Sequence, residues 1–587
     1  MGDDLDGTNK VSDCLTYLVA TITLEFMEEQ MSRAIVAKQS DMPIGSMKLV
    51  KVGGHRIVLV RTPTGFHALD NACPHEGYGL VTGALDGELL TCEWHNWKFN
   101  VADGDCVLGE EAVARHEVIL DGDDVIVTFA EPSPGSRRAA AAASLDRGID
   151  EQYDGQIARD SLRLLHAGAH PVDIIWQAIS RTSPRTEFGW THALAMTADC
   201  ITAVDELSGD DRLVPVAQAI SAMAESELRR PVRPRAAPVT PPASGAFEEY
   251  CALVEAERAD QADALLTGAL LDGLSRDEAA QWMIRPTTAH HLAFGHGAIY
   301  AQKAFEMLDA VGWERAPEML GHLAVMHVWS TREDKLPYMR PFLRTLDGSG
   351  LNARWNRPVD AAWAGRDALV EVLLGQDQVA GVAAAIDALD DGAGVAGLLD
   401  AVSVAASERM LRHDLAHEQH PDVSGYGWLD ITHSLTYANA ARWAWVTNPG
   451  EHTARLAMYT VFHVIDGGRY ATAGSRPAPV EQRSTLDDAL AESDPDAAVA
   501  AAFAEPIDAV QNSLVRASLD DRAGALIVVA HHVKTSRAAI REAAATGSRL
   551  PLAAAARYLA APSRQRFVAS GVTRARHFLT TGAPPPR

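Results

Sequence analysis

The sequence has few cysteines and no long apolar run. Six cysteines among 587 residues are too few for a secreted, disulfide-stabilised scaffold. The apolar stretch at residues 14–27 is interrupted by threonines and Glu25, so it is too short and too polar to span a bilayer. No basic segment with a small-residue cleavage site accompanies it, as a secretory signal would require. We therefore predict a cytoplasmic protein with no membrane partner.

Basic residues are also scarce relative to acidic ones. The chain has 52 lysines and arginines against 78 aspartates and glutamates, which gives a formal net charge of −26. An acidic surface repels nucleic acid and anionic lipid, so we predict neither as a partner. The length exceeds what one hydrophobic core usually supports, and more than one domain is expected.

The pattern of residues changes along the chain. Short β-like runs separated by Gly, Asp and Pro turns occupy residues 47–130 and predict a small all-β domain. Ala-rich amphipathic segments dominate from residue 145 to residue 575 and predict one large helical domain. The predicted organisation is an N-terminal extension of open role (1–46), the β domain (47–130), a linker (131–144) and the helical domain (145–575) with a Pro-rich insertion (230–245). The fold class is α+β multidomain.

The β segment contains two matched pairs of metal-ligand residues. Cys73-Pro74-His75 is followed, after sixteen residues, by Cys92-Glu93-Trp94-His95. Two thiolates suit one ferric ion and two neutral imidazoles suit another, provided that two opposed loops enclose a flat two-iron unit. Zinc also binds two Cys and two His, but its usual spacing does not put one of each on both loops. A two-iron cluster is therefore favoured.

The run CPHEGYGL…CEWHNWKFNVADGDC closely resembles the Rieske ferredoxin pattern over residues 47–130. The resemblance implies a [2Fe–2S] cluster held by Cys73, His75, Cys92 and His95. Asn96 stands where a glycine usually follows the second histidine, and asparagine tolerates the left-handed conformation expected there. Such a cluster transfers single electrons, so the long helical region suggests a consumer in the same chain, namely a mononuclear iron that activates O2.

A weak repeat in the helical region offers ligands for that second iron. Four segments open with Thr or Ala, then His, any residue, and Leu or Val, and small residues follow in each. The histidines of the repeat are His192, His290, His433 and His531. Small side chains allow helices to approach closely, so these imidazoles could converge inside a helix bundle. We expect a mononuclear Fe(II) there, unless the four are unrelated core or surface histidines.

The helical region resembles the questin oxidase-like proteins at two points. Tyr153-Asp154-Gly155 is similar to a turn near the start of that domain, and His531-His532-Val533-Lys534 is similar to a segment that carries a lysine. The family consists of helical enzymes that oxidatively open anthraquinone-type polyketides, and some members bind a non-haem iron through four histidines and a carboxylated lysine. The resemblance implies that Lys534 is a carboxylated ligand beside the catalytic His433, and that the substrate is a small aromatic molecule.

Two other interpretations remain open from the sequence. Standard Rieske oxygenases use two histidines and one carboxylate, and the pairs His291/His296 and His322/His327 have the histidine spacing but no acid three residues ahead. Alternatively, the chain is a non-enzymatic electron-transfer or redox-sensing protein. The oxygenase interpretation requires O2 and an external NAD(P)H-dependent reductase or ferredoxin, and it allows hydroxylation or C–C cleavage. The oligomeric state is left open.

Overall fold

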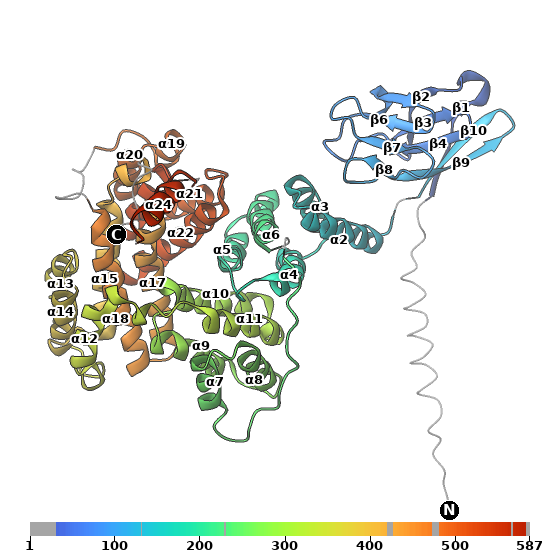
Figure 1. The fold of residues 1–587 in the computed structure, drawn as a ribbon. Coiled ribbons are helices and arrows are strands. Elements are labelled where there is room, and N and C mark those ends of the chain that lie inside the picture. The colour runs from blue at the N-terminus through green and yellow to red at the C-terminus, as the bar shows by residue number, and fades with distance from the viewer. Residues whose placement is uncertain are drawn as a thin grey trace, which may run out of the picture. The chain divides into compact units, whose positions relative to one another are not determined.

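The computed structural model describes residues 31–130, 132–227, 230–419, 426–471, 481–564 and 568–582. The chain forms two compact units. The first contains the described residues up to Gly148 together with Tyr153–Ala169, and the second contains Ile149–Gln152 and the chain from His170 onward. One unit is built mainly of strands and the other of helices (Figure 1), as the predicted fold class required.

The strands of the first unit form two antiparallel sheets. Their bounds are β1 (Met31–Lys38), β2 (Ser46–Val52), β3 (His55–Thr62), β4 (Gly65–Asp70), β5 (Ala84–Asp86), β6 (Leu89–Thr91), β7 (Lys98–Asn100), β8 (Cys106–Leu108), β9 (Arg115–Asp121) and β10 (Asp124–Ala130). The larger sheet has the order β1-β10-β9-β4-β3-β2, and the smaller has the order β5-β6-β7-β8. Strand β3 is buried on both faces, because Val58 and Val60 pack in one core cluster while Ile57 and Leu59 pack in another.

The β domain begins earlier than residue 47. Strand β1 pairs antiparallel with β10, so part of the predicted extension belongs to the larger sheet. The boundary at Met47 is therefore wrong, and only residues 1–30 of that extension lie outside the described residues. The sequence did not reveal this strand because its pairing partner lies at the far end of the domain.

The predicted linker is also wrong, because it is mostly helical. Helix α2 runs over Pro134–Asp150, with its proline at the first position and an alanine run behind it. Helix α3 (Asp154–His166) returns beside it, and the Gln156 side chain donates to the Ser144 carbonyl at 2.9 Å. Helix α2 as far as Gly148, and the whole of α3, belong to the first compact unit.

The described part of the second unit is mainly helical. Its helices are α4 (Pro171–Thr182), α5 (His192–Glu206), α6 (Leu213–Glu227), α7 (Ala246–Glu255), α8 (Ala259–Leu271), α9 (Arg276–Ala289), α10 (His296–Val311), α11 (Ala316–Trp329), α12 (Arg340–Gly348), α13 (Arg366–Leu373), α14 (Gln378–Asp390), α15 (Gly394–Leu411), α16 (Ala416–Gln419), α17 (Trp428–Thr447), α18 (Glu451–Asp466), α19 (Leu486–Glu492), α20 (Pro495–Ala504), α21 (Ile507–Leu519), α22 (Leu526–Thr546), α23 (Leu550–Ala560) and α24 (Val568–Thr581). Short 3-10 turns connect several of them.

The Pro-rich insertion has no helix or strand at residues 231–245, as its composition predicts. It is nevertheless fixed to the bundle. The Arg235 guanidinium bonds both carboxylate oxygens of Asp263 on α8 and the Pro317 carbonyl on α11. Gly268 lets the backbone of Val239 approach α8 so closely that a Cβ would lie 1.8 Å from the Val239 oxygen.

Four helices of the second unit form a closed ring. Helix α5 packs on α10, α10 on α17, α17 on α22, and α22 on α5. The centre of a ring of this kind is where bundle proteins place metal and cofactor ligands. Each of the four helices contributes one histidine to that centre.

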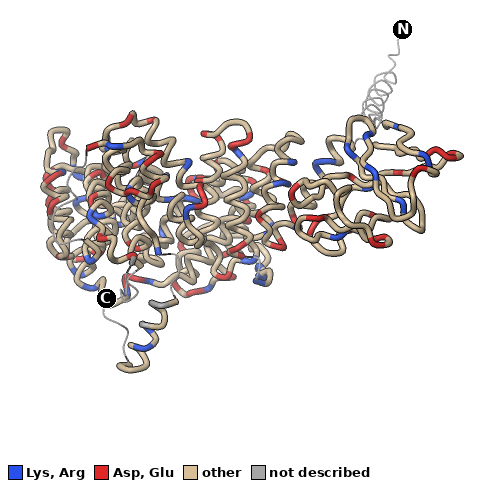
Figure 2. Tube along the Cα trace, turned by 90° about the horizontal axis from the view of Figure 1, so that it is seen from above, with Lys and Arg blue, Asp and Glu red and all other residues tan. Residues whose placement is uncertain are grey.

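The acidic residues are distributed along both units and are not gathered in one segment (Figure 2). No helix in the described ranges is both long and apolar enough to cross a bilayer.

Candidate metal centres

Two similar loops carry the Cys and His residues of the β unit. In each loop the cysteine amide donates to the carbonyl of the residue five positions later. Cys73 bonds Tyr78 and Cys92 bonds Trp97, both at 2.8 Å. Each loop also contains a left-handed residue, Gly77 with φ 77° in the first and Asn96 with φ 60° in the second. Asparagine therefore adopts the conformation that the sequence predicted at residue 96.

The four side chains of these loops converge. The Nδ1 atoms of His75 and His95 lie 2.9 Å apart, and the Cys73 and Cys92 side chains are buried beside one another. Two nitrogens bound cis to one metal at about 2.1 Å would lie about 3.0 Å apart, which matches. Burial raises the pKa of the Cys73 thiol to about 11, so only a nearby cation would keep it as the thiolate that binds iron. These residues fit a two-iron cluster with one Cys pair and one His pair.

The two histidines have different surroundings. His95 is exposed, whereas His75 is half-buried between Trp97, at 4.8 Å between ring centroids, and Tyr153, at 6.4 Å. The Arg159 guanidinium lies over Tyr153 and donates to the His75 carbonyl at 2.9 Å. Helix α3 thus covers one imidazole and leaves the other open. No pattern in the sequence indicates that Tyr153 and Arg159 reach the cluster loops.

We expect the Arg159→Gln substitution to lower the reduction potential of the cluster by about 20–50 mV, because a positive charge near a cluster stabilises its reduced form. A redox titration followed by visible absorption measures the shift. Arg163→Gln is the matched control, since Arg163 shares the Glu111 ion pair but makes no bond to His75. Equal shifts in both variants would mean that the contact with His75 has no special role.

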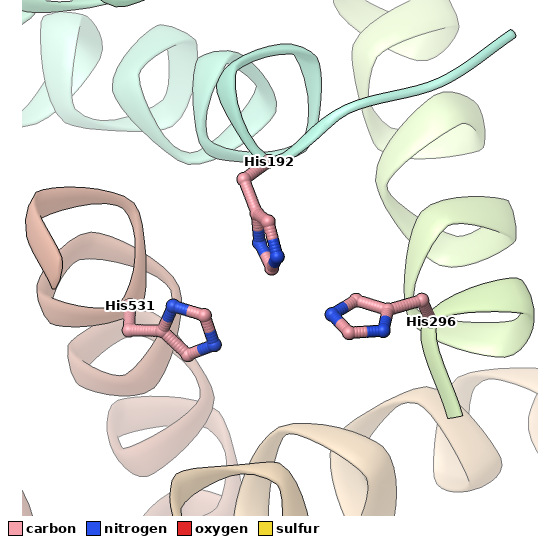
Figure 3. Close-up of side chains that lie close together, drawn as sticks. All are labelled: His192, His296 and His531. Atoms are coloured by element: carbon pink, nitrogen blue, oxygen red, sulfur yellow. The ribbon is translucent and has the colours of Figure 1, made fainter. Parts of the chain in front are cut away.

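In the helical unit, four imidazoles and one amine meet inside the ring of helices. His192 and His296 are the first residues of α5 and α10, and His433 and His531 are each the sixth residue of α17 and α22. Figure 3 shows His192, His296 and His531 pointing from three helices toward one space. Their ligand atoms lie within 4.8 Å of one another.

The distances in this group match cis coordination to one metal. Adjacent ring centroids lie 4.7 Å apart for His192–His296, 4.6 Å for His296–His433, 5.1 Å for His433–His531 and 4.8 Å for His531–His192. Two imidazoles bound at right angles to one metal would place their centroids about 4.5 Å apart. The Nε2 atoms of His296 and His433 face each other at 3.0 Å.

Backbone carbonyls fix the tautomers of three of these histidines. The Nδ1 atoms donate to carbonyls, His296 to Ala293 at 2.5 Å, His433 to Leu429, and His531 to Ile527 at 2.6 Å. An imidazole that carries its proton on Nδ1 offers Nε2 as an unprotonated acceptor, which is the form that binds metals. Two such acceptors facing each other at 3.0 Å repel unless a cation lies beside both.

Burial keeps all four imidazoles neutral. It lowers the pKa of His433 to about 3 and holds the pKa values of His192, His296 and His531 well below their usual range. The nearby Lys534 amine lowers each of these pKa values further. Neutral imidazoles at neutral pH are ready to bind a metal without first losing a proton.

Lys534 completes the group. It is 1% exposed, and its Nζ lies 2.7 Å from Nδ1 of His192. Burial lowers its pKa to about 7, Asp199 opposes that effect, and Lys303 adds to it. An amine with this pKa is largely neutral at physiological pH, and only a neutral lysine amine reacts with CO2 to form a carbamate.

His290 does not belong to this group, so its predicted place has to be corrected. The residue ends α9 as its C-cap, and its ring nitrogens contact Asp334 at 2.9 Å and Glu255 at 2.6 Å. Ala293 and Phe294 then adopt positive φ values of 47° and 56°, and this left-handed turn leads into His296 at the start of α10. His296, which was predicted only as part of an alternative ligand pair, is the fourth histidine of the group.

The remaining alternates lie elsewhere. His291 is fully buried against His463, Tyr437 and Tyr459. The Nε2 of His327 donates to the Gly297 carbonyl at 3.2 Å. Burial lowers the pKa of His322 to about 4, with Arg235 adding to the effect. Among the described residues, neither the pair His291/His296 nor the pair His322/His327 lies together in one group of metal-binding side chains.

Comparison with known proteins defines the class of the first unit. Residues 32–120 match the Rieske [2Fe–2S] domain. This part of the chain is therefore a Rieske [2Fe–2S] domain, and such a domain implies a [2Fe–2S] cluster.

This domain is similar to segments of several known proteins. The chain is 33% identical over 96 residues to human apoptosis-inducing factor 3, a match that covers 16% of each protein. It is 41% identical over 71 residues to the ferredoxin component of an alkene monooxygenase system from Xanthobacter autotrophicus, covering 12% of this chain and 57% of that protein. A complex of reduced oxygenase and oxidized ferredoxin in carbazole 1,9a-dioxygenase is 27% identical, with a TM-score of 0.17, covering 17% of this chain and 95% of that one. The chain thus spans about a sixth of the first of these relatives and over half of the second.

Proposed function

We propose that the chain is a non-haem iron oxygenase whose Rieske domain supplies electrons to an iron in the helical unit. His192, His296, His433, His531 and carboxylated Lys534 would hold that Fe(II). The observation that carries the proposal is the pair of facing acceptor nitrogens on His296 and His433, 3.0 Å apart, which needs a cation. The similarity to the ferredoxin component of an alkene monooxygenase system also supports an oxygenase function.

An iron in this site would supply the activation of O2 for oxidation of an organic substrate. The chain's own residues do the rest. Three backbone carbonyls orient the imidazoles of His296, His433 and His531. Tyr300, whose ring centroid lies 5.2 Å from that of His296, forms one aromatic wall beside the site.

The substrate class follows from the family resemblance at Lys534. We propose a small aromatic molecule of the polyketide or anthraquinone type, which is hydroxylated or cleaved at a C–C bond. Electrons would come from an external NAD(P)H-dependent reductase or a ferredoxin, and His95 is the exposed cluster ligand that such a partner could approach.

Iron content is the direct test. We expect three irons per chain by metal analysis, two of them in the cluster, together with O2 consumption that requires a reductant and an aromatic substrate. Removing the third iron with a mild chelator should stop O2 consumption while the visible absorption of the cluster persists. Two irons per chain in protein loaded with excess Fe(II) under CO2 would contradict the proposal and favour an electron carrier.

A further inference from the structure

A second set of buried polar groups lies beside the four-histidine group and has no role in holding it. His291 is 0% exposed, Tyr437 is 1% exposed and His463 is 3% exposed. Both ring nitrogens of His291, Nε2 of His463 and the Tyr437 hydroxyl make no hydrogen bond to any described residue. One carboxylate oxygen of Asp334, Oδ1, is buried in the same unpartnered way. We call these five atoms the inner polar line.

The inner polar line is continuous with the surface on one side. Glu255, whose side chain is 55% exposed, contacts Nε2 of His290 at 2.6 Å. Nδ1 of His290 contacts Oδ2 of Asp334 at 2.9 Å, so the other oxygen of that carboxylate faces inward. The amide of Glu333 donates to the His291 carbonyl at 2.9 Å, which holds the 333–334 turn against His291.

On the other side the line reaches the helices that carry the metal-site histidines. The His291 and His463 ring centroids lie 4.8 Å apart, and those of His463 and Tyr437 lie 4.7 Å apart. Phe294 touches both His463, at 5.0 Å, and His433, at 5.4 Å. A Cβ on Gly295, the residue before His296, would lie 3.0 Å from Nε2 of His463. The line therefore ends at the loop that places His296.

Buried groups without partners are where internal water is held, because each ordered water satisfies several of them at once. A neutral imidazole accepts a proton at one nitrogen and releases one from the other, so it can pass protons along a row of waters. Burial keeps His291 and His463 neutral, since it lowers their pKa values far below the usual range. His290 differs, because its hydrogen bonds to Asp334 and Glu255 outweigh burial and raise its pKa.

Oxygen chemistry at a buried site needs protons. Inserting one oxygen atom into a C–H bond follows O2 + R–H + 2e⁻ + 2H⁺ → R–OH + H2O, with both electrons supplied by the external reductase through the Rieske cluster. We propose that Glu255, His290, Asp334, His291 and His463, bridged by bound water, form the path by which these protons enter from solvent. The inference rests on the proposed oxygenase function, and it gives His290 a role other than metal ligation.

Asp334→Asn tests the path, because it removes the proton-accepting carboxylate with little change in shape. We expect this variant to keep three irons per chain, to consume O2 at least tenfold more slowly, and to show a larger solvent deuterium isotope effect. Asp277→Asn is the matched control, since Asp277 is 84% exposed on α9 and lies off the path. His290→Ala should also slow the reaction, and free imidazole should restore part of the rate.

A readout that does not depend on turnover completes the test. A high-resolution crystal structure of the wild-type protein should show ordered water between Oδ1 of Asp334 and His291. A dry gap, or an unchanged rate in Asp334→Asn with three irons bound, would overturn the path but leave the oxygenase intact. Loss of the third iron from Asp334→Asn would also overturn it, by making the residue a support for the metal site. Two irons in the loaded wild-type protein would refute the oxygenase itself.

Discussion

Replacing His433 with alanine should remove one iron from each chain and leave the visible spectrum of the Rieske cluster unchanged. The imidazole nitrogen of His433 faces that of His296 at 3.0 Å, and its tautomer is fixed by the Leu429 carbonyl. Loss of a group that merely orients a metal ligand costs about 10–100-fold in metal affinity or activity, so loss of a ligand should cost at least as much. We expect substrate-dependent O2 consumption to fall by at least about a hundredfold.

His290→Gln is the control for iron content. His290 neighbours the metal site in sequence but bonds Asp334 and Glu255, so this variant should retain three irons. Metal analysis and visible absorption of the two purified variants provide the comparison. If His433→Ala kept its third iron, or if His290→Gln lost it, the four-histidine group would not be the metal site.

Replacing Lys534 with methionine should weaken Fe(II) binding at least about tenfold while the protein remains folded. Methionine fills a similar volume and is at home in a buried position, so the substitution removes the amine and little else. In the wild-type protein, added bicarbonate should raise iron occupancy, because CO2 converts the neutral amine to an anionic ligand. The methionine variant should show no response to bicarbonate.

The pH dependence of this response has a definite sign. Burial lowers the pKa of Lys534 to about 7, so the amine is mostly neutral above that pH and mostly protonated below it. The bicarbonate effect should therefore increase as the pH rises through about 7 and be lost as the pH falls through that value. Occupancy measured by metal analysis after gel filtration gives the curve. Equal iron affinity in wild type and Lys534→Met, with or without bicarbonate, would show that Lys534 is not a ligand.

The cluster loops could be predicted from the sequence because all of their ligands are local. Cys73 and His75 share one loop, and Cys92 and His95 share the other, so spacing alone identifies the chemistry. Even the left-handed residue at Asn96 follows from the residue type. Strand β1 could not be predicted in this way, since its place depends on β10, a partner at the other end of the domain.

The helical site was harder to predict from the sequence, because its residues also come together from distant parts of the chain. The repeat selected three histidines that the structure brings together, yet it also selected His290, where the helix has already ended. The left-handed turn at Ala293 and Phe294 moves the next helix start to His296. Positive φ values at a β-carbon-bearing phenylalanine are set by tertiary packing, and no local sequence signal predicts them. Asp334 and His463 carried no signal either.

The contact of helix α3 with the cluster loops affects where the protein can be divided. A fragment that stops at residue 130 would contain both cluster loops and the ten strands of the described residues, yet it would lack the Tyr153 ring and the Arg159 guanidinium, which lie against His75. Water would then reach the His75 ring on the side that Tyr153 covers in the intact chain, and an isolated ferredoxin fragment of this kind would not report the redox behaviour of the intact chain. The natural place to cut is after Ala169, where the first compact unit ends.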